Sequence, residues 1–494
     1  MRARSSGHRE EVAAVALDLG STRIKAGLLA GDRDGFTEIL SVPAPRLRGK
    51  RLIREGDAEL LFRRADAVLR RVLKHAPSGL PLGVSSQRSS FVLWDRSDGR
   101  VRTPLISWQD RRAEPWCTAH REREAWIRER TGLPLSPHYA GPKLAWIFKG
   151  DAALRRQAEN GRLLFGTLET FCLWRWSRGE IHRTDASMAA RTLLADARRG
   201  GWSEELLEFF GIPANFLPEI KSSSGNQDRL ANGTLAAASL SDQAAGALAL
   251  LGPARKGMLV SLGTGGFVLR PSGSDFLLKK GYLTGPLLAN ATLGTRYALE
   301  GTINGCAGAL ALAPGPATRG KLPPRAFCLP DLSGVGAPHW RPDLTLTLSP
   351  EAQGLKPSLL RRVIAEGIAF RVREIAADLC HGRPQGLVRL AGGLAHDPLL
   401  ANLIAGALGM AVEIPQEPEA SLLGAAFLAA GRRFPARLQI RQVAPPKIGN
   451  LEDRYRSWKA WLTGVLVSKT DAPFEDSQPS GAFFRRGSSK GKGR

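Results

Sequence analysis

Two carboxylates in this sequence stand where apolar segments end, and both suit chemistry on a phosphate group. Asp18 ends the apolar run 12–19 just before the turn 20–22, and Asp242 follows the apolar stretch 235–240. A buried carboxylate is costly without a partner. Mg²⁺ beside phosphates is one partner for Asp18, and a structural salt bridge is the alternative. Asp242 can accept the proton of an attacking hydroxyl, or it can be no more than a helix N-cap.

Two short turns of glycine and hydroxyl residues repeat one layout in the two halves of the chain. Each follows an apolar run, "LDLGST" at 17–22 and "VSLGTG" at 260–265, and precedes another, as in a hairpin. Successive backbone N–H groups in such a turn form a concave anion site, and glycine lets a phosphate approach closely. Either turn alone is better explained as an ordinary hairpin. Because they lie half a chain apart, the pair predicts two similar halves that hold one polyphosphate between them.

Strands that alternate with helices run through the sequence, which favours an α/β architecture. Apolar runs bounded by turn residues predict strands, and stretches with helical periodicity and few breakers predict helices. The expected strands are 12–19, 24–30, 81–85, 91–94, 258–262, 267–270, 387–390 and 411–414. The expected helices are 57–75, 113–131, 142–160, 167–178, 203–210, 244–249, 398–408 and 446–467.

The repeated turns, the composition of the two ends and the family resemblance described below together divide the chain into five predicted segments. A basic extension (1–11) precedes an N-terminal domain (12–251), a C-terminal domain (252–436) and a helical region (437–467). Residues 468–494 are rich in Ser, Gly, Pro and charge, so we expect a disordered basic tail. Contact of this tail with nucleic acid or acidic lipid is an alternative, but so short a stretch favours an inert, solvated tail.

Bulk composition is that of a globular protein with an unusual charge. The chain has 494 residues and a formal net charge of +24, which attracts anions such as nucleotides. Solvated arginine-rich faces explain most of this excess, so we expect no nucleic-acid partner. None of the five cysteines forms a C-x-x-C pair, which favours a reduced, cytoplasmic setting over a zinc site or a disulfide framework. No run of about 18 apolar residues occurs, so no transmembrane helix is expected.

The sequence lacks the motifs of other nucleotide enzymes and of common hydrolases. It has no G-x-x-x-x-G-K-[ST] loop, and no G-x-G-x-x-G opens a helix after the first strand. H-E-x-x-H is also absent, and the one G-x-S-x-G match, at 487–491, lies in the basic tail and not at a strand-to-helix turn, so a metalloprotease and an esterase have no support. The paired turns therefore remain the main candidates for phosphate binding.

Nine segments, in order, resemble the FGGY family of carbohydrate kinases, which includes glycerol kinase and xylulokinase. The resemblance implies two actin/hexokinase-type (ribonuclease H-like) α/β domains with a cleft between them. It also implies that ATP and Mg²⁺ are used to phosphorylate a hydroxyl of a small polyol or sugar. The matching segments cover roughly residues 12–430: "ALDLGSTRIKAGLL" (16–29), "GVSSQRSSFVLWDRSDGRV" (83–101), "ISWQDRRA" (106–113), "FGTLETFCLWRWSRGEIHRTDASMAARTLL" (165–194), "SDQAAGALA" (241–249), "SLGTGGFVL" (261–269), "YALEGTI" (297–303), "GVGAPHW" (334–340) and "LAGGLAHDPLLANLIAGALGMAVE" (390–413).

The resemblance implies a role for each matching residue. Asp242 matches the catalytic base of the family, and Asp18 and Asp242 are the candidate Mg²⁺ ligands. The residues expected at the phosphates and the adenosine of ATP are Gly20, Ser21, Thr22, Arg23, Gly263, Thr264, Gly265, Gly392, Gly393 and Asp397. The residues expected at the substrate are Gln87, Arg88, Ser89, Trp108, Asp110, His138, Tyr139 and Gln243. Arg88 stands where glycerol kinase has a substrate-binding arginine.

The substrate side departs from the family pattern at three places. The acidic residue that follows the substrate-binding arginine of glycerol kinase is Ser89 here. A tyrosine of the glycerol kinase site falls on His138, although Tyr139 is adjacent, and the glycine before the catalytic aspartate is Ser241. These changes leave the substrate open between a glycerol-like polyol and a ketopentose.

The nucleotide side departs as well. The adenine-contacting glutamine of glycerol kinase falls on about Ala311, the asparagine near the adenosine turn falls on Asp397, and the segment 301–334 is shorter than usual. The alternative to an active kinase is therefore a catalytically impaired, FGGY-like nucleotide-binding or regulatory protein. The presence of Asp242 and of both phosphate turns favours the active enzyme, and the sequence leaves assembly into a homo-oligomer open.

Overall fold

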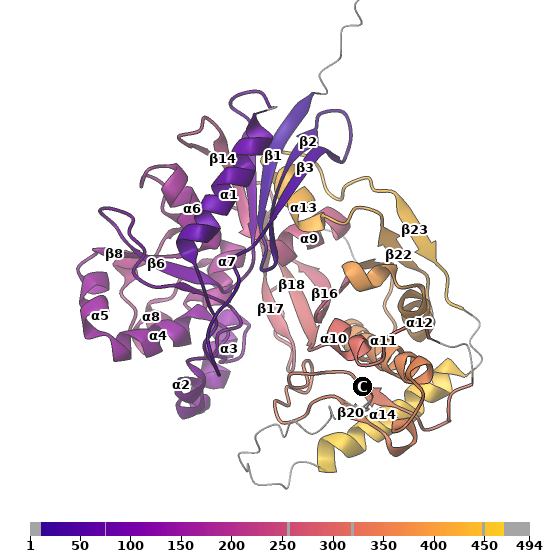
Figure 1. Ribbon diagram of the computed structural model, residues 1–494. Coiled ribbons are helices and arrows are strands. Elements are labelled where there is room, and N and C mark those ends of the chain that lie inside the picture. The colour runs from indigo at the N-terminus through magenta and orange to yellow at the C-terminus, as the bar shows by residue number, and fades with distance from the viewer. Residues whose placement is uncertain (1–10, 75, 254–256, 318–320, 447–449, 469–494) are drawn as a thin grey trace, which may run out of the picture.

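Two α/β domains lie side by side in the computed structural model, each built on a mixed β-sheet (Figure 1). The two-domain α/β architecture expected from the sequence is confirmed. The predicted N-terminal extension and basic tail lie, but for one residue each, outside the described part of the chain. The structure describes residues 11–74, 76–253, 257–317, 321–446 and 450–468.

The N-terminal sheet has six strands in the order β13-β14-β5-β1-β2-β3. Its central strand β1 pairs antiparallel with β2 and parallel with β5. Residues 14–19 of β1 are buried, because the sheet is covered on both faces, and this explains the unbroken apolar run. The strands are β1 (Val12–Leu19), β2 (Arg23–Ala30), β3 (Phe36–Pro43), β5 (Pro81–Ser86), β13 (Ser224–Arg229) and β14 (Leu235–Ser241).

The C-terminal sheet repeats this arrangement in its centre. Strand β15 pairs antiparallel with β16 and parallel with β21, as β1 does with β2 and β5. The two glycine turns thus join equivalent hairpins, as the repeat in the sequence predicts. The sheet order is β17-β18-β16-β15-β21-β22-β23. The strands are β15 (Gly257–Leu262), β16 (Gly266–Gly273), β17 (Leu283–Asn290), β18 (Gly294–Ile303), β21 (Leu387–Ala391), β22 (Val412–Pro415) and β23 (Ile440–Val443).

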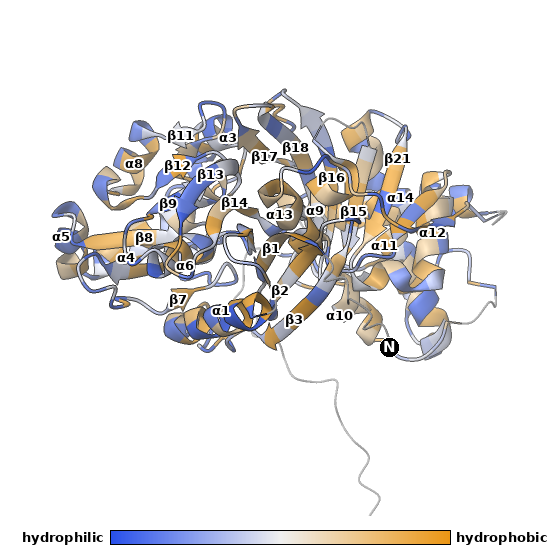
Figure 2. Ribbon diagram, turned by 90° about the horizontal axis from the view of Figure 1, so that it is seen from above, coloured by the Kyte–Doolittle hydropathy of each residue, from blue (hydrophilic) through white to orange (hydrophobic). Residues whose placement is uncertain are grey.

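Two small-residue helices, α9 (Asp242–Leu251) and α13 (Ala420–Ala429), pack between the sheets (Figure 2). Helix α13 comes late in the chain but lies against β1 and β5 of the first sheet. A Cβ atom on Gly83 would lie 2.0 Å from the Ala425 carbonyl oxygen, and one on Gly424 would lie 2.0 Å from that of Ala245. Only glycine at these positions lets the backbones approach so closely.

Most of the predicted helices form, with two breaks that local residues explain. The expected helix 113–131 divides into α2 (Glu114–Ala119) and α3 (Glu124–Thr131), with a 3₁₀ turn between them. The expected helix 142–160 divides where the Asp151 side chain accepts a hydrogen bond from the Leu154 backbone and starts a new helix. The helices on either side are α4 (Ala140–Gly150) and α5 (Ala152–Glu159).

The remaining helices pack against the sheets or against one another. The others that matter here are α1 (Ala58–Leu73), α6 (Leu168–Trp176), α7 (Ala186–Ala189), α8 (Glu204–Phe210), α10 (Cys306–Ala311), α11 (Pro357–Cys380), α12 (Pro398–Leu408) and α14 (Leu451–Ser468). Helix α11 was not predicted from the sequence. Strand β23 pairs with β22, and Trp458 of α14 is buried in the C-terminal core, so this unit continues beyond the boundary expected at 436. Within the described residues, no helix is both long and apolar enough to cross a membrane.

Candidate active site

Asp18 lies at the end of β1, buried behind the first glycine turn. The Ser85 hydroxyl donates a hydrogen bond of 2.6 Å to its carboxylate. The pKa of Asp18 is raised to about 7, mainly by burial and also by the negative charge of Asp242, against the opposing effects of the Ser85 hydrogen bond and of Lys25. Lys25 itself forms an ion pair with Glu419. Asp18 is therefore a buried acid with no ion-pair partner among the described residues.

Asp242 is the first residue of α9. Its negative charge acts on Asp18. Ser241, not Asp242, is the N-cap, since its hydroxyl accepts a hydrogen bond from the Ala244 backbone. The Asp242 carboxylate accepts a hydrogen bond of 2.8 Å from the Gln243 backbone N–H, at the start of the same helix. Burial raises the pKa of Asp242, Glu300 raises it further, and Arg88 and Arg191 oppose the rise.

These two acids fit a divalent cation. The negative charge of Asp242 raises the pKa of Asp18, and a cation shared by the two carboxylates would relieve that repulsion. Among the described residues, no group of three or more His, Cys, Asp or Glu side chains could hold a metal by itself. Mg²⁺ typically uses one or two carboxylates together with waters and substrate phosphates, which this sparse donor set matches.

Arg88, Arg191 and Glu300 form a buried ion cluster that joins the two domains. The Arg88 guanidinium donates bonds of 2.7 and 3.1 Å to the two oxygens of Glu300, and Arg191 donates one of 2.9 Å. The two arginines hold the pKa of Glu300 at about 2 against the effect of burial. Tyr139 is buried beside this cluster, and burial raises the pKa of its hydroxyl.

A narrow pocket opens between the domains at this cluster. Its walls come from both domains. It is lined by Arg88, Ser187, Arg191, Ser241, Gln243, Ala244, Leu269, Gly285, Pro286, Leu287, Ala298 and Glu300. Of the predicted substrate residues, the structure places Arg88 and Gln243 on its wall, with Tyr139 against Arg191 and Glu300.

Other predicted substrate residues have structural partners. The Ser89 hydroxyl donates to the Arg191 carbonyl at 3.0 Å, and the residue adopts a left-handed φ of 64°. Gln87 accepts a bond from Ser90, and the Trp108 carbonyl contacts a ring nitrogen of His138. Ser89 and Gln87 are buried, whereas Trp108 and His138 are exposed, and none of the four lines the pocket.

Asp110, a predicted substrate residue, has structural partners on both of its carboxylate oxygens. It is buried, accepts a bond from the Arg54 backbone at 2.6 Å and forms an ion pair with Arg112 at 2.8 Å. These bonds lower the pKa of Asp110 in spite of burial. We therefore infer that Asp110 stabilises the loop that contains Trp108.

Both glycine turns expose the groups that a phosphate would need. Ser21, Thr22 and Thr264 are exposed. The second turn is closed by a hydrogen bond of 2.8 Å from the Gly263 N–H to the Gly265 carbonyl. Arg23 is turned away, because its guanidinium bonds Ser41 on β3.

The third glycine segment meets the second turn by a close backbone approach. Gly392 has a φ of 83°, and a Cβ atom there would lie 2.3 Å from the Leu262 carbonyl oxygen. Asp397, a few residues on, caps α12 and pairs with Arg361 at 3.1 Å. The Asp397 carboxylate thus has two partners already, while Gly393 borders open space.

The sequence analysis missed Arg191 and Glu300, although both lie in segments that carry the family resemblance. A signal was present for Glu300. It interrupts residues 297–303, which are buried throughout, and a charge in a buried strand requires a partner from elsewhere. Nothing in one sequence identifies Arg191 as that partner, because the two are 109 residues apart.

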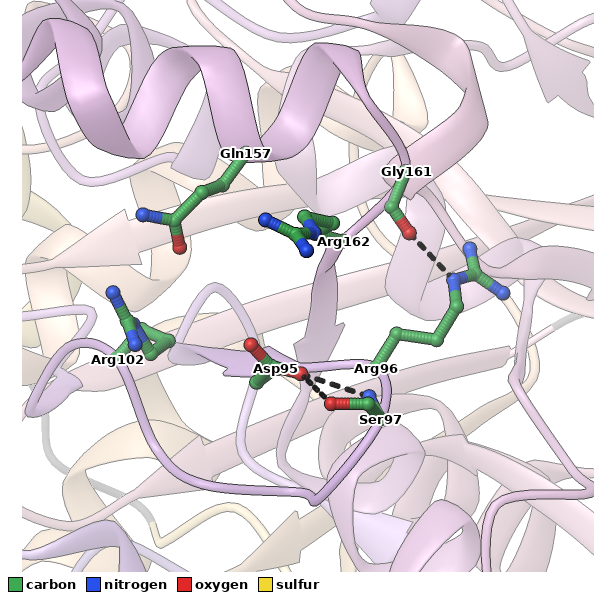
Figure 3. Close-up of a pocket in the computed structure, with 7 residues that line it drawn as sticks. All are labelled: Asp95, Arg96, Ser97, Arg102, Gln157, Gly161 and Arg162. Atoms are coloured by element: carbon green, nitrogen blue, oxygen red, sulfur yellow. Dashed lines mark hydrogen bonds between the residues drawn. The ribbon is translucent and has the colours of Figure 1, made fainter.

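A second hollow lies elsewhere, in the N-terminal domain beside β6 (Phe91–Asp95), β8 (Leu163–Thr167) and α5 (Figure 3). Its volume is about 560 Å³, and it is lined by Asp95, Arg96, Ser97, Arg102, Gln157, Gly161 and Arg162. Asp95 is held by Ser97, and Arg96 donates to the Gly161 carbonyl at 2.8 Å. This open surface hollow contains none of the acids with raised pKa, so the active site is assigned to the interdomain pocket.

The fold and this site define a class of proteins: two-domain α/β proteins with equivalent glycine turns in the two sheets and a pocket between the domains. Models of the FGGY family of carbohydrate kinases match the chain, the N-terminal domain at residues 13–244 and the C-terminal domain at 258–431. The protein belongs to the FGGY family of carbohydrate kinases. It is therefore an ATP-binding carbohydrate or polyol kinase.

Two relatives and two solved structures show how close the similarity is. The chain is 33% identical over 407 residues to a glycerol kinase of Methylobacterium nodulans, covering 76% of this chain and 80% of that one. It is 35% identical over 387 residues to a glycerol kinase of Thermus brockianus, covering 74% and 78%. The fold matches Plasmodium falciparum glycerol kinase with ADP (TM-score 0.78, 19% identity, 92% of this chain and 98% of that chain). It also matches a xylulose kinase of Lactobacillus acidophilus (TM-score 0.79, 19% identity, 92% and 98%).

Proposed function

We propose that the protein transfers the γ-phosphoryl group of MgATP to a hydroxyl of a small polyol or sugar, with Asp242 as the general base. The acceptor is a glycerol-like polyol or a ketopentose. The observation that carries this proposal is the position of Asp242 at the start of α9, half-buried beside the interdomain pocket with a raised pKa. A base with a raised pKa accepts a proton more readily at neutral pH.

The chain's own groups account for the steps of the reaction. Asp242 orients the acceptor hydroxyl and takes its proton as the oxygen attacks the phosphorus in line. Arg88 binds a second oxygen of the acceptor. The backbone N–H groups of the turns at 20–22 and 263–265 bind the phosphates. Asp18 and Asp242 would hold Mg²⁺, which when bound offsets negative charge on the phosphate oxygens.

The location of the pocket between two domains supports phosphoryl transfer to a hydroxyl rather than to water. Its walls come from both sheets, so closure of the domains brings the walls together and excludes solvent. A site open to water would hydrolyse ATP without an acceptor.

A second candidate function, a nucleotide-binding or regulatory protein with impaired catalysis, is favoured by one observation. Arg361 binds Asp397 and lies 3.4 Å from the carbonyl oxygens of Leu310 and Ala313, at the end of α10. The segments where the family contacts adenosine are thus tied to each other by an arginine.

An acceptor screen separates the two candidates. Purified protein is incubated with ATP, Mg²⁺ and a panel of polyols, ketoses and sugar acids, and ADP release is measured by a coupled assay. Acceptor-dependent ADP release with formation of a phosphorylated product supports the kinase. ATP binding without ADP release across the panel supports the second candidate and contradicts the first.

A further inference from the structure

The two guanidinium groups of the substrate pocket are arranged as an anion-binding pair. Arg88 and Arg191 both come from the N-terminal domain and converge on one point, the Oε2 atom of Glu300, at 2.7 and 2.9 Å. Arginine binds carboxylates and phosphates with paired N–H donors, so such a point would attract an anionic group of any ligand. In this protein the position is filled by a side chain of the opposite domain.

Glu300 fills this position firmly. Its side chain is 4% exposed, and both of its oxygens accept bonds from Arg88. The two arginines keep the carboxyl ionised, since they hold its pKa at about 2. The nearest other acid of the pocket is Asp242, which feels the charge of Glu300 directly. The two positive charges of the pocket are thus matched by two negative ones, Glu300 and Asp242.

We propose that Glu300 is a specificity-determining residue, which restricts the acceptor to uncharged polyols and sugars by occupying the place between Arg88 and Arg191 where a substrate carboxylate would bind. This inference rests on the proposed function and names the substrate class of that same site. A substrate with a carboxylate would have to displace Glu300 or lie beside it. Either arrangement leaves like charges together in a buried pocket, which is strongly unfavourable. A neutral hydroxyl meets no such repulsion and can share the arginine donors.

The test compares matched acceptors that differ by one group. Glycerol is paired with glycerate, erythritol with erythronate and xylulose with xylonate, and kcat/KM is measured for each. For the wild type we expect the neutral member of an active pair to be preferred by at least about a hundredfold. In Glu300→Gln, the acid-to-neutral ratio of kcat/KM should rise by at least about tenfold, mainly through a lower KM for the acid.

A matched control comes from helix α11 of the same domain. Glu374 is buried and pairs with Arg371, but it lies in a network with His339, outside the pocket lining. Glu374→Gln removes the same charge from a comparable ion pair, and the selectivity ratio should stay within about twofold of the wild type. A merely structural role of Glu300 would lower activity on both members of a pair, as this control does, without changing their ratio.

A further variant keeps the test decisive if Glu300→Gln does not fold. Arg191→Gln leaves the Arg88–Glu300 pair intact and makes the pocket more negative, so the acid-to-neutral ratio should fall below that of the wild type. A rise would overturn the inference, as would a wild type that uses an acid as well as its neutral partner, or an unchanged ratio in folded Glu300→Gln. Absence of turnover with every neutral and acidic acceptor would instead overturn the proposed function itself.

Discussion

The proposed substrate pocket and the proposed phosphate turns would hold their ligands by different means. The pocket depends on buried, charged side chains that are fixed to one another across two domains. The turns depend on backbone N–H groups and exposed hydroxyls, and only a few glycines are sterically required there. The difference teaches that substitutions in the pocket should act through charge, whereas those at the turns should act through shape. Four substitutions, taken in order of expected effect, test this contrast.

Asp242→Asn should have the largest effect. It removes the proposed base and keeps the shape of the side chain, so kcat should fall by about 10²–10⁴-fold while ATP binding is largely retained. The coupled ADP assay and nucleotide titration measure the two quantities. Asp151→Asn changes an aspartate at the start of another helix, α5, and should leave kcat unaltered. Equal kcat values for Asp242→Asn and the wild type would refute the assignment of the base.

Arg88→Ala should come next, with its damage concentrated in the acceptor KM. The substitution removes a charged donor from the pocket and leaves Glu300 with Arg191 alone, for an expected rise in KM of about 10–10²-fold. Arg88→Lys retains the charge but not the two-pronged donor, so it should recover only part of the affinity. Steady-state kinetics with the best acceptor give the result, and an unaltered KM would place Arg88 outside the pocket.

Gly392→Ala should impair the nucleotide side through shape alone. The new methyl group would meet the Leu262 carbonyl at 2.3 Å in a left-handed backbone conformation, just before the second turn. We expect the KM for ATP to rise by about tenfold, with little change in the acceptor KM. Gly354→Ala introduces the same backbone strain, at a φ of 76°, into open space and serves as the control. A change confined to the acceptor KM would contradict the separate roles proposed for the pocket and for the glycine turns.

Asp397→Asn should have the smallest effect. Asparagine still caps α12, and the lost ion pair with Arg361 is partly exposed on both sides, at 21% each. Such pairs contribute about 0–1 kcal/mol, so the free energy of unfolding and the KM for ATP should change little. Thermal melts and ATP titration measure both. A large gain in ATP affinity would show that the Asp397–Arg361 pair obstructs the nucleotide and would favour the impaired protein.

The sequence predicted the fold well because its signals were local. The two hairpins, the expected strands and the turn residues between them are decided by neighbours in the chain, and the structure contains them. Helix α11 escaped detection because it is buried over much of its length, so it lacks the polar face that marks a surface helix. The break at Asp151 was likewise hidden, since a good cap looks like any other aspartate in a charged stretch.

The site was less predictable, and the reason is distance along the chain. Asp18 and Asp242 could be proposed because each follows its own strand. The pairing of Glu300 with Arg88 and Arg191 spans 212 and 109 residues, and nothing local selects those partners. Asp110 shows the converse. Its carboxylate suggested a contact with substrate, yet it forms an ion pair with the buried Arg112.

The close seating of α13 against Gly83 and Ala245 bears on how the protein is made. Residues 420–429 cover β1 and β5, which leave the ribosome hundreds of residues earlier, so the first sheet must wait with one apolar face unprotected. The N-terminal domain thus cannot complete its own interior during synthesis. A fragment ending at residue 251 should aggregate, and adding a separate chain that contains α13 should restore its solubility.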